Sequence, residues 1–229
     1  MMIDPVVVPM LALGYAIGSL PVAWALSRTW AGIDIREYGT GNPGAANVYR
    51  NVGMVPAVLV ALAGFLQGLG PVLLARALGF DETTAALVGV AAMAGYGWPA
   101  TQRFRGGRGV AVTIGVVSAF AAGPAAVLAG IYLACIPIKR TSIATFVCLL
   151  ALPVYFALTG WPGLVIALSG LALTYIVTRR LWGIWDYARG REGLAGLILR
   201  RAILDASPGQ CLVGPRVEPA GERVGRESI

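Results

Sequence analysis

A short basic and glycine-rich stretch, residues 103–110, has the residue types that bind phosphate. It reads RFRGGRGV and contains three arginines and three glycines. Arginine presents a planar fork of N–H donors that matches phosphate oxygens, and glycine lets the backbone turn and bring amide groups close to a ligand. Such a turn, leading into a helix, suits a phosphate cradle. The alternative is a positively charged loop that only fixes the topology of the chain.

Two further polar stretches interrupt the apolar chain. Residues 39–47 read GTGNPGAAN, where Thr40, Asn42 and Asn47 offer a hydroxyl and two amides. A turn with a helix cap is the alternative there, and for Asn47 alone it is the favoured one. Ser142 and Thr145 are three positions apart, so both hydroxyls share one helix face near its start, where anions are favoured. Hydroxyls in membrane helices also bond their own backbone, which is the favoured interpretation for each residue singly.

The composition indicates an integral membrane protein. Of 229 residues, 57% are hydrophobic and only 13% are charged, whereas a soluble domain has about 25% charged residues. The chain has no histidine, which excludes histidine metal sites, Ser–His triads and histidine general bases. Its three cysteines have no metal-ligand spacing. Membrane topology and anionic lipid explain the net charge of +7 better than nucleic acid does.

The apolar segments predict an all-α polytopic membrane protein. They are expected at residues 5–26, 52–74, 84–100, 110–138, 141–158 and 163–177. If residues 110–138 turn back at Ala122-Gly123-Pro124, there are seven transmembrane helices with the N-terminus outside and the C-terminus cytoplasmic. That topology puts every one of the 18 basic residues except Arg76 on the cytoplasmic side, as the positive-inside rule favours. Two helices from this stretch would each be shorter than the ~30 Å hydrocarbon core.

This topology has a consequence for function and for domain organisation. The three polar stretches fall on the cytoplasmic side, so they can converge on one site. Residues 1–200 are expected to form one integral membrane domain, and residues 201–229 a disordered cytoplasmic tail, because the tail is polar and lacks apolar periodicity.

Four motifs together resemble the bacterial acyl-phosphate:glycerol-3-phosphate acyltransferases. They are GSLP at 18–21, GTGNPGAANV at 39–48, FRGGRGVA at 104–111, and Ser142 with Thr145. The resemblance covers about residues 5–195 and implies acyl transfer from acyl phosphate to the 1-hydroxyl of glycerol 3-phosphate. The product would be lysophosphatidic acid, a phospholipid precursor. The resemblance also implies a multi-pass protein of the cell's inner or plasma membrane, with a cytoplasmic active face and without metal, coenzyme or nucleic acid.

The resemblance also implies a set of site residues. The substrate-binding residues it gives are Thr40, Asn42, Asn47, Gly106, Gly107, Arg108, Ser142 and Thr145. No catalytic residue is assigned, because Tyr96 stands where the family has a histidine. The oligomeric state is left open.

Departures from the family pattern bear on whether the chain is active. Arg108 replaces a lysine, Thr40 a serine, and the tail motif reads Arg179-Arg180 without its histidine. A tyrosine with a reference pKa near 10 is a poor general base. The leaving phosphate of the donor can take the substrate proton instead, and losing a protein base costs about 10²–10⁴-fold in rate. The alternatives are an inactive paralogue that binds a phosphate-bearing lipid or metabolite, or a protein with another acceptor or a transport role.

Overall fold

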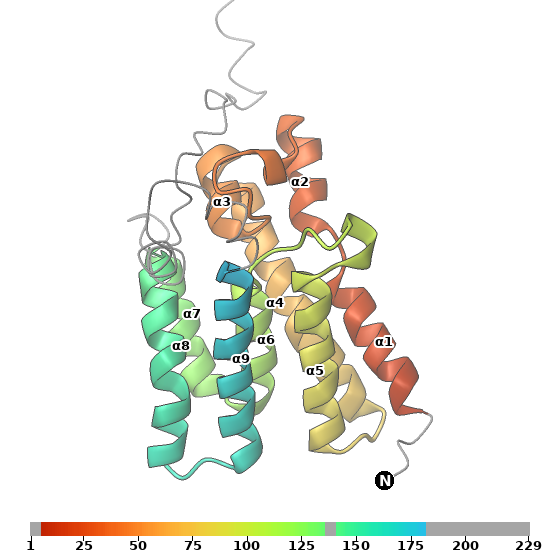
Figure 1. The fold of residues 1–229 in the computed structure, drawn as a ribbon, viewed down its shortest axis with the longest axis vertical. Coiled ribbons are helices and arrows are strands. Elements are labelled where there is room, and N and C mark those ends of the chain that lie inside the picture. The colour runs from red at the N-terminus through yellow and green to blue at the C-terminus, as the bar shows by residue number, and fades with distance from the viewer. Residues whose placement is uncertain (1–5, 136–140, 182–229) are drawn as a thin grey trace, which may run out of the picture.

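The protein is a bundle of helices (Figure 1). The computed structural model describes residues 6–135 and 141–181, and the side chains of residues 141–144 lie outside that description. The elements are α1 (Val7–Gly18), α2 (Val22–Ala31), η1 (Ile35–Glu37), α3 (Ala45–Asn51), α4 (Met54–Ala77), α5 (Glu82–Gly97), η2 (Ala100–Gln102), α6 (Val110–Phe120), α7 (Ala122–Cys135), α8 (Thr141–Leu158) and α9 (Gly163–Leu181). The prediction of an all-α protein is confirmed over these residues, which contain no strand.

Several helices are apolar enough to lie in a membrane. Three apolar segments are also long enough to cross one: Val7–Ala31, which comprises α1 and α2, Met54–Ala77 and Gly163–Leu181. Shorter apolar helices cover Val110–Phe120, Ala122–Cys135 and Thr145–Leu158. Large apolar side chains such as Leu62, Leu66 and Val154 point away from the bundle with more than half of their surface exposed. An outer surface of this kind suits hydrocarbon and not water.

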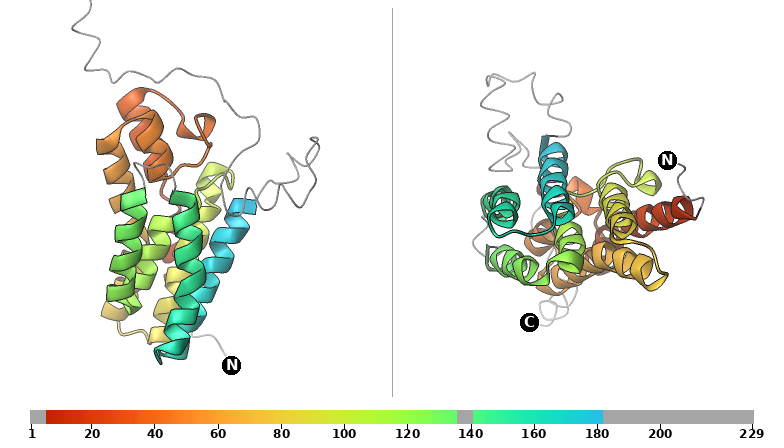
Figure 2. Two further views of the ribbon diagram at one scale, coloured as in Figure 1. Left: turned by 90° about the vertical axis from the view of Figure 1, so that its left-hand side faces the viewer. Right: turned by 90° about the horizontal axis from the view of Figure 1, so that it is seen from below.

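The long apolar stretch after the basic loop divides into two helices, as predicted. α6 ends at Phe120 and α7 begins at Ala122, so the break is at Ala121, one residue before the expected turn at Ala122-Gly123-Pro124. The two helices run in opposite directions beside each other (Figures 1 and 2). They have 11 and 14 residues, so each is about 17–21 Å long and shorter than the ~30 Å hydrocarbon core.

The first apolar segment differs from the single helix predicted over residues 5–26. α1 ends at Gly18, and α2 begins after Pro21, whose ring nitrogen cannot donate to a preceding carbonyl. The buried Gln67 of α4 compensates by donating through Nε2 to the carbonyls of Ile17 at 2.9 Å and Leu20 at 3.1 Å. The polar loop predicted over 27–51 also differs, because its second part forms α3.

Glycines let two pairs of helices in the bundle pack with their backbones in close contact. A Cβ atom at Gly18 of α1 would fall on the carbonyl of Ala92 in α5, and one at Gly68 of α4 on the carbonyl of Val112 in α6. Small residues at such crossings allow backbone contact in membrane helices. α5 and α6 flank the basic loop, so this packing fixes both ends of the loop.

Candidate functional site

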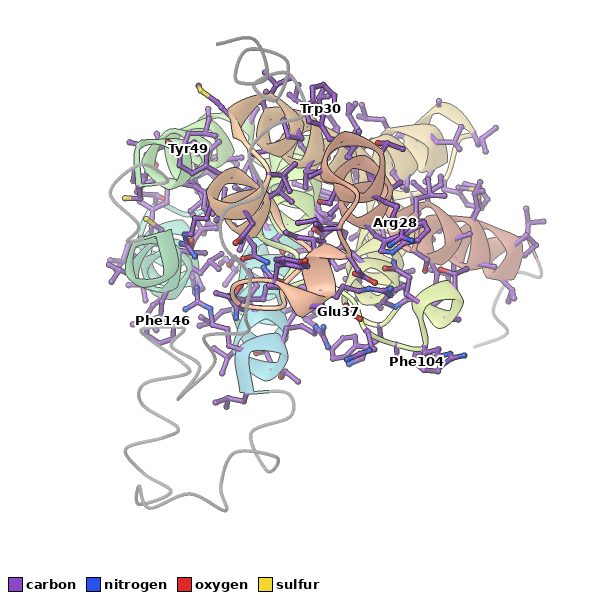
Figure 3. The ribbon with its side chains drawn as sticks, turned by 90° about the horizontal axis from the view of Figure 1, so that it is seen from above. Arg28, Trp30, Glu37, Tyr49, Phe104 and Phe146 are labelled. Carbon is purple, nitrogen blue, oxygen red and sulfur yellow. The ribbon has the colours of Figure 1, made fainter. Side chains whose placement is uncertain are left out.

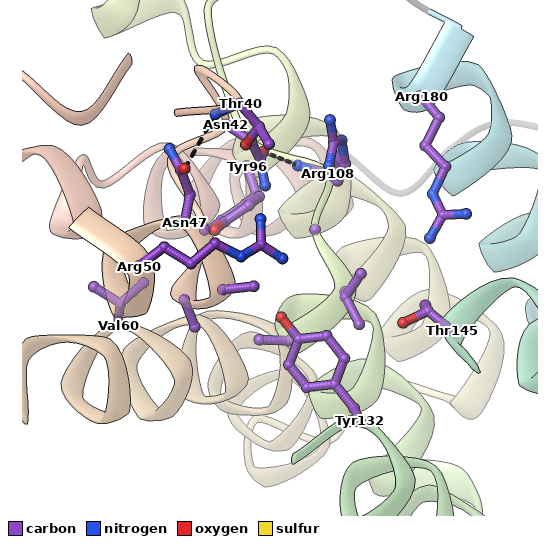
Figure 4. Close-up of a pocket in the computed structure, with 16 residues that line it drawn as sticks. Thr40, Asn42, Asn47, Arg50, Val60, Tyr96, Arg108, Tyr132, Thr145 and Arg180 are labelled. Carbon is purple, nitrogen blue, oxygen red and sulfur yellow. Dashed lines mark hydrogen bonds between the residues drawn. The ribbon is translucent and has the colours of Figure 1, made fainter. Parts of the chain in front are cut away.

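One polar cavity lies where the three stretches singled out in the sequence meet (Figure 4). Its walls come from the first loop (residues 39–47), which runs into α3, from the basic loop (residues 103–109), from the start of α6, from α4, and from the ends of α5, α7, α8 and α9. The lining residues are Thr40, Asn42, Gly44, Ala45, Ala46, Asn47, Arg50, Val60, Tyr96, Arg108, Gly109, Val110, Ala111, Tyr132, Thr145 and Arg180. The prediction that the polar stretches converge is therefore confirmed for the described residues.

Three arginines from three separate elements surround this cavity. Arg50 comes from α3, Arg108 from the basic loop and Arg180 from α9 (Figure 4). Arg180 is only 4% exposed. The described lining residues include no carboxylate. Charge of one sign in a partly buried cleft attracts the opposite sign strongly, and a guanidinium fits phosphate oxygens in a bidentate geometry. The cavity is thus built for an anion with more than one negative charge.

Asn47 organises the first loop through both ends of its side-chain amide. Its Oδ1 accepts from the amide of Thr40 at 3.2 Å and from Nδ2 of Asn51 at 3.0 Å. Its Nδ2 donates to the carbonyl of Tyr38 at 2.9 Å and to that of Ile35 at 3.3 Å. These bonds, at a residue 2% exposed, give Asn47 a structural role in holding the loop. Its contact with substrate stays a prediction.

Asn42 joins the first loop to the basic loop. Its Oδ1 accepts a hydrogen bond of 3.1 Å from the main-chain amide of Arg108. The bond sets where the Arg108 side chain leaves the backbone, at the start of α6. Gly109 follows with a φ of +76°, a value that favours glycine, and a Cβ there would fall on the hydroxyl of Tyr175.

The two neighbouring glycines of the basic loop turn toward the protein. The amide of Gly107 donates to the carbonyl of Tyr96 at 3.2 Å. A Cβ at Gly106 would fall on the carbonyls of Tyr96 and Gly97, so the close approach needs glycine. Gly106 and Gly107 line a second, smaller cavity. The amides of Gly107 and Arg108 are thus used within the protein, and the loop offers the Arg108 side chain to the polar cavity; contact of the two glycines with substrate stays a prediction.

Arg179, which belongs to α9, holds the backbone of the same two glycines. Its Nε donates to the carbonyl of Gly107 at 3.0 Å, and Nη2 donates to that of Gly106 at 2.6 Å. The guanidinium also lies 5.1 Å from the ring centre of Trp98, a distance typical of a cation–π contact. Arg179, which stands in the tail motif that lacks the family's histidine, therefore shapes the basic loop.

Tyr96, at the end of α5, stands between the two loops. Its hydroxyl donates to the carbonyl of Pro43 at 3.0 Å, and its own carbonyl accepts from Gly107. The side chain borders both the polar cavity and the smaller one. Because the phenol proton is bonded to a carbonyl, this geometry fits a positioning role and not proton abstraction from a substrate.

Of the two candidate hydroxyl residues of α8, only Thr145 has a described side chain. Thr145 is 2% exposed and lines the cavity. Ser142 belongs to the first turn of α8, but its side chain lies outside the described residues. Within the described part of the chain, no group of three histidine, cysteine or acidic side chains could hold a metal ion.

Sequence reasoning missed Arg50, Tyr132 and Arg180 as lining residues. Arg50 follows Asn47 by three positions in the same helix, so helical spacing was a usable signal. Arg180 directly follows Arg179 in α9, and adjacent side chains of a helix point about 100° apart, so the two arginines need not face the same part of the site. A tyrosine inside an apolar helix such as α7 gave no signal.

Comparisons with known proteins show the family of the chain. The family model described as glycerol-3-phosphate acyltransferase matches residues 8–184. A glycerol-3-phosphate acyltransferase from Synechococcus sp. (strain CC9902) is 35% identical over 188 residues, covering 82% of this chain and 94% of the relative. A relative of the same name from Rubrobacter xylanophilus is 40% identical over 151 residues, covering 66% of this chain and 75% of its own.

Solved structures are similar as well. The crystal structure of PlsY, an integral membrane glycerol 3-phosphate acyltransferase, in its glycerol 3-phosphate form has a TM-score of 0.69 and 29% identity, covering 82% of this chain and 94% of its own. The lysophosphatidic acid form has a TM-score of 0.68 and 28% identity, covering 85% and 99%. The chain belongs to the glycerol-3-phosphate acyltransferase family.

Proposed function

We propose that this protein transfers a fatty acyl group from acyl phosphate to the 1-hydroxyl of glycerol 3-phosphate and so makes lysophosphatidic acid. The observation that carries the proposal is the cavity itself: Arg50, Arg108 and Arg180 surround it, and no carboxylate is among its described lining residues. Both substrates bear a phosphate, so their joint binding needs more than one cation. The family membership and the two PlsY complexes support the same substrates.

The chemistry needs position and charge more than a protein base. Holding donor and acceptor phosphates among the arginines places the hydroxyl beside the acyl carbonyl carbon. The hydroxyl oxygen attacks that carbon, the bond from the carbonyl carbon to the phosphate oxygen breaks, and inorganic phosphate leaves with the hydroxyl proton. The arginines stabilise the negative charge that develops on the carbonyl and on the leaving phosphate. Asn42, Tyr96 and Arg179 hold the loops that carry Arg108.

An apolar cavity between α7 and α8 can take the acyl chain. It has a volume of about 560 Å³, and its lining residues are Gly123, Pro124, Val127, Leu128, Ile131, Cys148, Ala151, Leu152 and Tyr155. Ile131 precedes Tyr132 and Cys148 follows Thr145 by one turn, and Tyr132 and Thr145 line the polar cavity. The apolar space therefore leads toward the arginines, as a substrate with a charged head and an apolar tail requires.

Turnover by the purified full-length protein tests the function directly. The assay supplies palmitoyl phosphate and labelled glycerol 3-phosphate in detergent and measures labelled lysophosphatidic acid. The expected result is product with this donor, with palmitoyl-CoA and glycerol as the mismatched donor and acceptor controls. Binding of glycerol 3-phosphate without product would contradict the proposal and favour the inactive paralogue.

The acyl site has its own test in a matched pair of variants. Ala151→Phe fills the apolar cavity, whereas Ala157→Phe puts the same bulk on an exposed position of α8 that does not line it. Ala151→Phe is expected to lower kcat/KM for palmitoyl phosphate about tenfold, with butyryl phosphate little changed. An equal loss for both donors, or the same loss in Ala157→Phe, would place the acyl chain elsewhere.

We also infer seven crossings with the N-terminus outside and the pocket facing the cytoplasm of the cell membrane, in a domain of residues 1–200 followed by a tail at 201–229. The tail lies outside the described residues. In support, Arg76 and the three pocket arginines lie at opposite ends of the bundle. Arg76, at the end away from the pocket, donates to the carbonyl of Ala119 at 2.6 Å and pairs with Glu82.

Cysteine labelling in intact cells tests this topology. In a variant without native cysteines, Thr83→Cys, at an exposed position in the first turn of α5, is expected to react with an impermeant maleimide. Glu37→Cys, at the pocket end, is expected to react only after permeabilisation. The reverse pattern would contradict the proposed orientation.

A further inference from the structure

The tip of the basic loop, residues 103–105, has no part in the proposed reaction. Phe104 exposes 57% of its surface, and Arg103 and Arg105 on either side are exposed too. Arg103 and Phe104 both have positive φ, at 54° and 60°. Non-glycine residues seldom adopt this region, and among the described residues these are the two that do. Such a conformation persists only where its surroundings hold it.

A set of main-chain hydrogen bonds holds this tip in place. The amide of Phe104 donates to the carbonyl of Pro99 at 2.9 Å, and the amide of Arg105 to that of Gln102 at 3.1 Å. Arg179 fixes the next two residues through their carbonyls. These bonds therefore hold the Phe104 ring outward, away from the bundle and between the two arginines.

The tip lies at the side of the bundle, near the level where its apolar helices end. Seen from above, Phe104 projects from the rim beside α5 and not over the centre (Figure 3). The loop is tied to the end of α1 because Thr101 donates to the carbonyl of Ser19 at 3.3 Å and Ala100 donates to the hydroxyl of Tyr15 at 3.0 Å. α5 has 16 residues, about 24 Å, so the tip follows a helix that covers most of the ~30 Å hydrocarbon core.

We propose that residues 103–105 form a binding site for anionic phospholipid, in which the Phe104 ring enters the interfacial layer and Arg103 and Arg105 bind lipid phosphates. Aromatic side chains prefer the membrane interface, and basic residues beside it are attracted to anionic headgroups. Arginine also matches the phosphate group in shape. The site is distinct from the polar cavity, whose described lining includes none of these three residues. It therefore does not depend on the proposed reaction.

A spin label at the tip measures the insertion. Full-length protein without its three native cysteines receives a nitroxide at Phe104→Cys, or at Glu37→Cys as an exposed control at the same end (Figure 3). Both proteins are placed in nanodiscs of phosphatidylcholine with or without phosphatidylglycerol. The measurement is collisional accessibility to oxygen, which concentrates in lipid, relative to a water-soluble nickel chelate.

The label at position 104 is expected to favour oxygen about threefold or more over the label at position 37 when phosphatidylglycerol is present. Arg103→Gln with Arg105→Gln is expected to remove most of that difference, and the two lysine replacements to retain it in part. Equal accessibility at positions 104 and 37 would overturn the insertion. The same insertion in pure phosphatidylcholine, or in the double glutamine variant, would overturn the anionic lipid site. Unchanged gel-filtration profiles show that the variants are folded.

Discussion

The main-chain amide of Arg108 donates a hydrogen bond of 3.1 Å to Oδ1 of Asn42, which lies 66 positions earlier in the chain. This bond couples the first loop to the residue that carries the central cation of the pocket. Asn42→Ala removes the acceptor, and we expect kcat/KM for glycerol 3-phosphate to fall about tenfold, since a lost hydrogen bond of this kind is worth about 1 kcal/mol or more. Thr29→Ala, on the exposed face of α2, is the control. Activity equal to that of the control would show that the bond does not position Arg108.

Asn47→Ala tests whether Asn47 is structural. Its side chain bonds the backbone at Thr40 and Tyr38, and truncation leaves these groups without it. We expect destabilisation of about 1–3 kcal/mol, measured as a lower unfolding temperature in detergent. Asn51→Ala, which removes a less buried amide from the same helix, should have a smaller effect. If Asn47→Ala loses activity with an unchanged unfolding temperature, Asn47 acts on the substrate instead.

Tyr96→Phe separates positioning from proton transfer. The variant keeps the ring and loses only the hydrogen bond to the carbonyl of Pro43. We expect KM for glycerol 3-phosphate to rise a few-fold with kcat nearly unchanged, because about 1 kcal/mol of loop positioning is lost. A general base would show a loss of kcat of about 10²-fold or more. Steady-state kinetics over a range of both substrates distinguishes the two results.

The ion pair of Asp34 and Arg36, just before the first loop, makes the stability of the fold depend on pH. The hydrogen bond from Arg36 lowers the pKa of Asp34 below its ordinary 3.8. A carboxyl with a lowered folded pKa stabilises the fold above its unfolded pKa, and this contribution is lost as pH falls through the folded value. We therefore expect the unfolding temperature to drop below about pH 4.

Asp34→Asn should lose that part of the pH dependence. The expected loss at neutral pH is only about 0.5–1 kcal/mol, since the pair is partly solvated. Thermal unfolding at pH 3 to 7 makes the comparison, with Glu37→Gln as an exposed carboxyl control. Parallel curves for the wild type and Asp34→Asn would contradict the assignment.

Much of the fold was predictable because it follows from apolar length and charge. The division of residues 110–138 into two helices was predictable from Gly123-Pro124 and from the distribution of basic residues along the chain. The break between α1 and α2 was less visible, because its stability comes from Gln67, a residue distant in sequence that satisfies the carbonyls at the break. Hydrogen bonds of that kind depend on tertiary contact and leave no periodic signal.

The location of the site was predictable from the sequence, but the roles of its individual residues were less predictable. Polar motifs on one side of the membrane predicted the convergence of Asn42, Arg108 and Thr145, which line one cavity. The pattern of glycines suggested amides facing a ligand, yet Gly107 bonds Tyr96 and its carbonyl accepts from Arg179. Glycine spacing indicates a tight turn but does not say which side of the turn faces the cavity.

The measurement that tests the account most directly is kcat/KM of Arg108→Ala with palmitoyl phosphate and glycerol 3-phosphate, beside Arg28→Ala, an exposed cation on α2. If Arg108 binds substrate phosphate at the centre of the pocket, its removal should lower kcat/KM by about 10²-fold or more, while Arg28→Ala stays within about twofold of wild type. Two variants with equal activity would contradict the claim that the cavity around Arg108 is where acyl transfer takes place.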